Sequence, residues 1–217
     1  MQTVKKTIRK TIERDISWLS FNARVLQEAA DPNVPLKEKI KFLGIFSNNL
    51  DEFFRVRVAA LKRMISFGKK ARMHLEESPQ KILDAIQHIV LEQQSEFNRI
   101  WQNIILDLRK EKIFLVTEKK LNREQQKFVV DFFEEQVRPN VIPLMIESIE
   151  QFPYLREKSI YLAVVMSRKN SAYKRKYALI EVPTRAVSRF NLLPASKPGE
   201  HNIIFLEDII RYNLPRI

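Results

Sequence analysis

The chain contains no cysteine and only three glycines, and each of these shortages excludes a class of site. Without cysteine there is no disulfide framework and no thiolate to act as nucleophile or metal ligand. The glycines, Gly44, Gly68 and Gly199, stand too far apart to form the phosphate-binding loops GxxxxGKS, GxxxxGKT or GxGxxG. If the protein handles a nucleotide, a different kind of site must hold it.

The sequence also lacks the features of membrane and secreted proteins. It has no run of about 18 apolar residues, which a membrane-spanning helix requires. The N-terminal residues MQTVKKTIRKTIERD contain no apolar core and therefore do not form a secretory signal. Hydrophobic residues make up 45% of the 217 positions, enough for a packed core in one or two domains. Together with the absence of cysteine, this composition predicts a folded protein of the reducing cytoplasm.

Acidic residues are few relative to basic ones, and the net charge is +12. Such a surplus favours a polyanionic partner, although it is also typical of a well-solvated surface. Between Phe53 and Leu75 there are seven basic residues and no carboxylate: Arg55, Arg57, Lys62, Arg63, Lys69, Lys70 and Arg72. This block could follow a phosphate chain or form a solvated helix face. A second basic cluster, residues 168–176, is typical of a charged hairpin loop.

The first half of the sequence predicts three amphipathic helices. The first has Ser17 as its N-cap and ends at Asp31-Pro32. Its apolar side is predicted to carry Trp18, Phe21, Val25, Leu26 and Ala29. The second runs from Pro35 to about Ser66, and the third begins at Ser78-Pro79. A stripe marks the buried side of the third: Ile82, Ile86, Ile89, Gln93, Phe97, Ile100 and Ile104. Three such helices with short links predict a helical bundle over residues 1–108.

The second half, residues 109–217, has a mixed pattern. Short apolar runs at 113–116, 159–166, 177–182 and 202–206 predict strands, with the second and third runs forming a pair. Asn122 and Gln125 have the spacing of a capping box for a helix that reaches about Val137. A short helix follows the last strand. The fold class is therefore α+β, with a helical bundle followed by an α+β domain that we expect to be incomplete within this chain.

One polar residue interrupts the apolar face of the second helix. Phe42, Phe46, Asn49, Phe53, Val56 and Ala60 follow steps of four and three residues. A buried amide without a partner costs about 1–3 kcal/mol, so Asn49 needs a reason to be there. Its donor and acceptor match the N6/N7 edge of adenine, and Phe42 could stack on the base. The alternative is that Asn49 bonds to a neighbouring helix.

The remaining candidates for chemistry are weak. Asp51 and Glu52 are adjacent on a helix and point in directions about a third of a turn apart, so they converge poorly on one metal ion. His74, His88 and His201 have no metal-ligand spacing. The residues considered one by one predict no catalytic group and no metal site.

Two long segments resemble a known family. RDISWLSFNARVLQEAAD and PLKEKIKFLGIFSNNLDEFFRVRVAALKR resemble the N-terminal domain of bacterial polyphosphate kinases of the histidine-phosphorylating type. Later segments, including FPYLREKSIYLAVVM and IIFLEDIIRYNLP, resemble the second, "head" domain of that family. The resemblance covers most of the chain.

The resemblance implies an enzyme that reversibly transfers the terminal phosphate of ATP to inorganic polyphosphate, through a phosphohistidine and with Mg²⁺. It implies that this histidine and the Mg²⁺ ligands belong to domains beyond residue 217, so the chain is expected to be inactive alone. It places Asn49, the second asparagine of SNNLDEF, in the ATP site, with Phe42 lining the same pocket. It also implies a homo-oligomer, with subunit association through the head domain and, in some bacteria, peripheral membrane association. The alternative is a basic helical module that binds nucleic acid or other polyanions without catalysis; with the resemblance, nucleic acid is not the expected partner.

Overall fold

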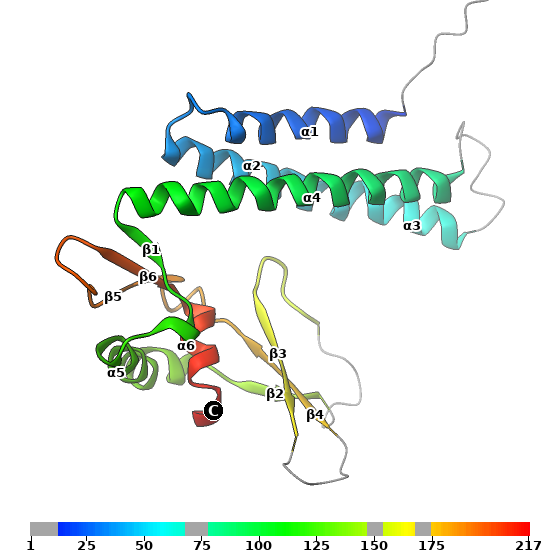
Figure 1. Cartoon of the computed structure of the whole chain (residues 1–217). Helices are drawn as coiled ribbons and strands as arrows, with labels where there is room; N and C mark the ends of the chain where they lie inside the picture. The colour runs from blue at the N-terminus through cyan, green and yellow to red at the C-terminus, as the bar shows by residue number, and fades with distance from the viewer. Residues whose placement is uncertain (1–12, 68–77, 147–153, 168–174) are drawn as a thin grey trace, which may run out of the picture. The chain divides into compact units, whose positions relative to one another are not determined.

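The computed structural model describes residues 13–67, 78–146, 154–167 and 175–217. The chain divides into two compact units, Met1–Leu108 and Arg109–Ile217. The first unit is built of helices, and the second combines helices with two three-stranded sheets (Figure 1). The predicted α+β class, with a helical region followed by strands, is confirmed.

Four α-helices and one π-helical turn form the described part of the first unit. Their bounds are α1 (Arg14–Ala30), α2 (Leu36–Phe53), the π-helical turn Phe54–Val58, α3 (Ala59–Ser66) and α4 (Pro79–Lys110). α1 begins three residues before the predicted cap, because the carboxylate of Glu13 accepts hydrogen bonds from the backbone N–H groups of Asp15 and Ile16. Ser17 lies inside the helix, so its predicted role as N-cap was wrong. The predicted end at Asp31 is confirmed.

The helices of the first unit pack around two apolar clusters. One contains Leu19, Phe53 and Ile86, and the other contains Leu26, Phe46 and Ile100. The apolar residues of the predicted α4 stripe lie in these clusters, and Gln93 of the stripe is also buried. Phe21 of α1, in contrast, is 63% exposed and was wrongly assigned to the buried side. The buried positions of α1 are instead Asp15, Leu19, Asn22, Leu26 and Ala29.

The π-helical turn changes which side of the second predicted helix is buried. A π turn inserts one extra residue and rotates the side chains that follow it. Val56, expected on the apolar face, is half exposed, while Val58 and Leu61 are buried in its place. The prediction of one helix from Pro35 to Ser66 therefore had the right extent, but its uniform stripe was wrong beyond Phe53.

The second unit begins with a strand and a capped helix. Its elements are β1 (Ile113–Leu115), the 3₁₀ turn Glu118–Lys120, α5 (Arg123–Phe132), the π-helical turn Phe133–Val137, the 3₁₀ turn Arg138–Asn140, β2 (Pro143–Met145), β3 (Tyr161–Met166), β4 (Lys176–Glu181), β5 (Phe190–Leu193), β6 (His201–Phe205), α6 (Leu206–Tyr212) and the 3₁₀ turn Leu214–Arg216. The predicted capping box is confirmed: Asn122 Oδ1 accepts from the N–H of Gln125, and Gln125 Oε1 accepts from the N–H of Asn122.

The strands form two separate sheets. One has the order β1-β6-β5, with β1 parallel and β5 antiparallel to β6. The other has the order β2-β4-β3 and is antiparallel, so that Val164 pairs with Ala178. The predicted pairing of the runs at 159–166 and 177–182 is confirmed, whereas the short strands β2 and β5 were not predicted. A core around Phe133, Ile180, Ile204 and Ile209 packs α5, α6 and strands of both sheets together.

Within the ranges that the structure describes, no helix has both the length and the apolar character needed to cross a membrane.

Candidate functional site

The seam between α1 and α2 gathers polar and aromatic side chains in the first unit. The two helices pack against each other along the bundle (Figure 1). On α1, positions 15, 18 and 22 recur at helical spacing, and on the facing segment positions 49, 53 and 57 do the same. We call this set the α1–α2 seam, defined by Asp15, Trp18, Asn22, Asn49, Phe53 and Arg57.

An ion pair connects the N-terminal end of α1 to the π-helical turn after α2. Arg57 donates from Nε to Asp15 Oδ1 at 2.7 Å and from Nη2 to Asp15 Oδ2 at 3.0 Å. The Asp15 side chain is 3% exposed and that of Arg57 is 36% exposed. The hydrogen bond to Asp15 raises the pKa of Arg57 above its usual value, against the opposing effect of burial. This two-pronged pairing holds the π-helical turn to the start of α1.

Next to the ion pair, two aromatic rings line a pocket. Trp18 and Phe53 stack with centroids 4.7 Å apart and ring planes 10° apart. The pocket has a volume of about 360 Å³ and is lined by Arg14, Asp15, Trp18, Glu52, Phe53, Val56 and Arg57. A volume of this size suits a small planar ligand or part of a larger one. The lining combines apolar faces with the charged groups of both signs.

One helical turn from the stacked rings, two asparagines face each other across the seam. Asn49 donates from Nδ2 to Oδ1 of Asn22 at 3.0 Å, and Asn22 donates from Nδ2 to the backbone carbonyl of Phe46 at 3.4 Å. Asn22 is fully buried, whereas Asn49 is half-buried. Asn49 therefore does bond to a neighbouring helix, as the alternative interpretation of its position foresaw. Its carboxamide oxygen has no hydrogen-bond partner within the described residues.

Phe42, the second residue expected in the ATP site, lies elsewhere on α2. It is partly buried and packs against the cluster that contains Leu43, Phe46 and Ile100. The rings that line the pocket are those of Trp18 and Phe53. The structure thus pairs Asn49 with Asn22, and it places Phe42 against the bundle's own core. The neighbours Ser47 and Asn48 are exposed.

The basic block after Phe53 is partly engaged in ion pairs. Arg55 pairs with Asp51 and Glu52 on the same helix, and Arg57 pairs with Asp15. Lys62 and Arg63 are exposed, and the other basic residues of the block lie outside the described residues. Asp51 and Glu52 thus both bind one guanidinium. The described part of the block, up to Arg63, carries no argument for a nucleic-acid interface.

The described histidines and the described part of the second basic cluster add no site. His88 is exposed and lies beside Glu92, and His201 is exposed on β6, while His74 falls outside the described residues. In residues 168–176, only Arg175 and Lys176 are described. Among the residues that the structure describes, no group of three or more histidine, aspartate or glutamate side chains could hold a metal ion.

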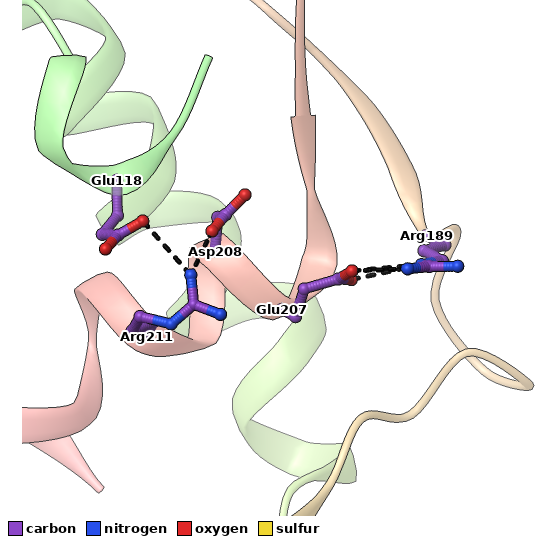
Figure 2. A network of polar contacts seen from close by, with 5 residues as sticks. All are labelled: Glu118, Arg189, Glu207, Asp208 and Arg211. Carbon is purple, nitrogen blue, oxygen red and sulfur yellow. Dashed lines mark hydrogen bonds and ion pairs between the residues drawn. The ribbon is translucent and has the colours of Figure 1, made fainter. Parts of the chain in front are cut away.

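The second unit holds a network of charged side chains around α6 (Figure 2). Arg211 Nη1 lies between two carboxylates, Glu118 Oε2 at 3.3 Å and the closer Asp208 Oδ1. Burial, followed by the interaction with Glu118, raises the pKa of Asp208 to about 6. Burial opposes ionisation of Glu118, but its interactions with Asp208, its own backbone and Arg211 outweigh burial and lower its pKa.

A second ion pair joins the same helix to the loop before β5. Arg189 Nη2 lies 2.6 Å from Glu207 Oε1 (Figure 2). The same guanidinium lies 5.6 Å from the centre of the Phe205 ring. Hydrogen bonding to Glu207 raises the pKa of Arg189, against burial. These contacts link α6 to the loops around it, so the network stabilises the second unit.

Taken together, the α1–α2 seam supplies groups for binding rather than for bond making. It offers an amide edge, aromatic faces and a guanidinium. Of these groups, Asn49 was predicted from the sequence, whereas Asn22 and Asp15, the partner of Arg57, were not. A signal for Asn22 was present, because Leu19, Asn22, Leu26 and Ala29 follow steps of three and four residues.

Two family descriptions match the chain in succession. The polyphosphate kinase N-terminal domain matches residues 11–116, and the polyphosphate kinase middle domain matches residues 124–217. The chain is 42% identical over 208 residues to a polyphosphate kinase of Vibrio cholerae, and 38% identical over 208 residues to one of Escherichia coli. In each case 95% of this chain is covered. It spans 29% of the V. cholerae protein and 30% of the E. coli protein.

A solved structure agrees with these sequence relationships. The crystal structure of a polyphosphate kinase from Porphyromonas gingivalis superposes with a TM-score of 0.82 at 35% identity, covering 94% of this chain and 30% of that one. The chain therefore spans about 30% of the length of the relatives that it matches. Since both domain descriptions together match most of its residues, the chain belongs to the polyphosphate kinase family.

Proposed function

We propose that this chain forms the N-terminal part of an enzyme that reversibly transfers the terminal phosphate of ATP to inorganic polyphosphate. The observation that carries the proposal is the succession of two polyphosphate kinase domains along residues 11–217. The reaction proceeds through a phosphohistidine outside this chain, and the chain alone does not catalyse it. Mg²⁺ would neutralise phosphate charge and would be bound by parts of the enzyme outside this chain.

Within that enzyme, the first unit contributes to the ATP site through Asn49. The side chain is half-buried, and its carboxamide oxygen is not used by the described residues, so it can accept a hydrogen bond from the amino group of adenine. The second hydrogen of its amide nitrogen can reach the ring nitrogen beside that amino group. Phe42 belongs to the same segment and has the weaker argument, because its ring already packs against the core cluster around Phe46.

The second unit begins the head domain, which contributes to subunit association in a homo-oligomer. We place the enzyme in the cytoplasm, with the peripheral membrane association that the family resemblance implies for some bacteria. The chain has 38 basic and 26 acidic residues, and this surplus of positive charge supports a polyanionic substrate. Polyphosphate carries about one negative charge per phosphate unit, so its binding should weaken steeply as salt increases.

Replacing Asn49 with alanine in the complete enzyme tests the ATP site. We expect KM for ATP to rise roughly fivefold to tenfold, because about 1 kcal/mol or slightly more of hydrogen bonding to the base is lost. Steady-state kinetics at saturating polyphosphate measures this change.

Asn48→Ala is the matched control, since Asn48 is the same residue type, adjacent in sequence and exposed. It should leave KM unchanged. If Asn49→Ala lowers the melting temperature and leaves the kinetics intact, Asn49 serves only the helix contact to Asn22.

A further inference from the structure

A short series of hydrogen bonds determines which way the Asn49 amide faces. A backbone carbonyl can only accept, so the amide group of Asn22 that lies 3.4 Å from the Phe46 carbonyl must be its NH₂. The oxygen of Asn22 is thereby turned to Asn49. Because an oxygen can only accept, Asn49 must present its own NH₂ at 3.0 Å. The carbonyl on α2 thus sets the orientation of two side chains in succession.

Asn22 and Asn49 differ in burial, and this difference gives them different roles. Asn22 has no exposed surface, so it cannot touch a ligand that enters from solvent. Asn49 is half-buried and keeps an oxygen and one amide hydrogen for such a ligand. Asn22 therefore does not contact the ligand directly, and its hydrogen bond to Asn49 connects it to the site.

We propose that Asn22 is a positioning residue that locks the Asn49 carboxamide in one orientation and so makes the site selective for adenine. Adenine presents a donor, its amino group, beside a ring-nitrogen acceptor, whereas guanine presents two acceptors at the same edge. An amide in a fixed orientation pairs twice with adenine and once with guanine. An amide that is free to turn must be ordered when adenine binds. The entropy cost of this ordering reduces the preference for adenine. This inference depends on the proposed ATP-site role of Asn49.

The test is Asn22→Leu in the complete enzyme, assayed with ATP and with GTP. Leucine fills a similar volume and offers no hydrogen bond, so the Asn49 amide is released. We expect KM for ATP to rise roughly threefold to tenfold with kcat nearly unchanged, and the preference for ATP over GTP to fall by a similar factor. Should Asn22→Leu fail to fold, Asn22→Ser is the second variant, because its hydroxyl is too short to maintain the 3.0 Å bond to Asn49.

A double-mutant cycle distinguishes positioning from general loosening of the bundle. If Asn22 acts through Asn49, adding Asn22→Leu to Asn49→Ala should change neither KM nor base preference further. Gln93→Leu is the matched control: Gln93 is also buried, and its amide donates at 3.0 Å to the Leu19 carbonyl in the same bundle. It should lower stability without altering the ATP/GTP preference.

The outcomes separate this inference from the proposed function. If Asn49→Ala raises KM but Asn22→Leu leaves both KM and base preference unchanged, the positioning role is wrong and the ATP site stands. An effect of Asn22→Leu that persists in the Asn49→Ala background also overturns the positioning role. If Asn49→Ala itself has no kinetic effect, the ATP-site assignment fails first.

Discussion

Two sets of amide side chains, one in each unit of the chain, form hydrogen bonds in different ways. In the second unit, Gln125 donates to the Pro194 carbonyl at 3.0 Å and to Ser196 Oγ at 3.2 Å, and Asn202 donates to the same hydroxyl. These bonds connect α5 and β6 to the loop before β6. In the first unit, the hydrogen bonds run from the Phe46 carbonyl through Asn22 to the half-buried Asn49. The carboxamide oxygen of Asn49 is not used by the described residues. An amide side chain whose hydrogen bonds are all made within the fold serves stability. An amide that keeps a polar group at the surface is available to bind a ligand.

The sequence itself provides separate probes for this comparison. The two tryptophans, Trp18 and Trp101, lie in the first unit, and all five tyrosines lie in the second. Tryptophan fluorescence therefore follows the first unit, and near-ultraviolet circular dichroism of tyrosine follows the second. Each stability prediction can be assigned to the unit that carries the change.

The largest effect is expected at the ion pair of the α1–α2 seam. Arg57→Leu leaves the carboxylate of Asp15 buried without its guanidinium. We expect the free energy of unfolding to fall by about 2–3 kcal/mol, less than for a fully buried pair because Arg57 reaches solvent. Urea titration followed by tryptophan fluorescence measures the loss.

The matched control is Lys41→Met, which removes an exposed ion pair with Glu38 on the same helix. It should change stability by about 0.5 kcal/mol or less. Equal losses for the two variants would show that burial of Asp15 is not what makes its ion pair important.

A smaller effect is expected at the capping box of α5. Asn122→Ala removes the oxygen that accepts from the N–H of Gln125, and we expect a loss of about 1 kcal/mol. Asn122→Asp keeps an oxygen at that position and should retain most of the stability. Urea titration followed by the tyrosine signal measures both variants. If the aspartate variant is as unstable as the alanine variant, the cap contributes little.

The smallest effect is a pH dependence at Asp208. Its pKa is raised to about 6, so between roughly pH 4 and 6 the folded protein holds a proton that the unfolded chain releases. Its contribution to stability therefore falls as the pH rises through this window. Asp208→Asn removes that fall while Glu118 and Arg211 remain.

We expect the melting temperature of Asp208→Asn, relative to the unchanged chain, to rise by about 2–4 °C between pH 4 and pH 7. Differential scanning calorimetry at several pH values provides the measurement. A difference that stays constant or shrinks with rising pH would mean that the attraction of Arg211 outweighs the cost of burying the carboxylate.

Local sequence signals predicted the elements whose causes are local. The capping box at Asn122 and the stripe of α4 depend on residues a few positions apart, so their patterns were readable. The β3–β4 pair was readable because each strand is a local apolar run and the two runs are close in sequence. The π-helical turn at Phe54–Val58 was not predicted, because it is decided by which side chains fit between the packed helices. The cap of α1 was misplaced for a simpler reason, since Glu13 is an uncommon capping residue.

The sequence by itself determined the α+β class, the basic surplus, the family resemblance and the unusual place of Asn49 among apolar neighbours. Only the tertiary structure decided the partners of that amide and of Arg57, which lie 27 and 42 residues away along the chain. The reason is physical: helical periodicity shows which face of a helix is buried, but hydrogen bonds across a seam depend on the register in which two helices pack. That register brings Asn22 to Asn49 and Asp15 to Arg57.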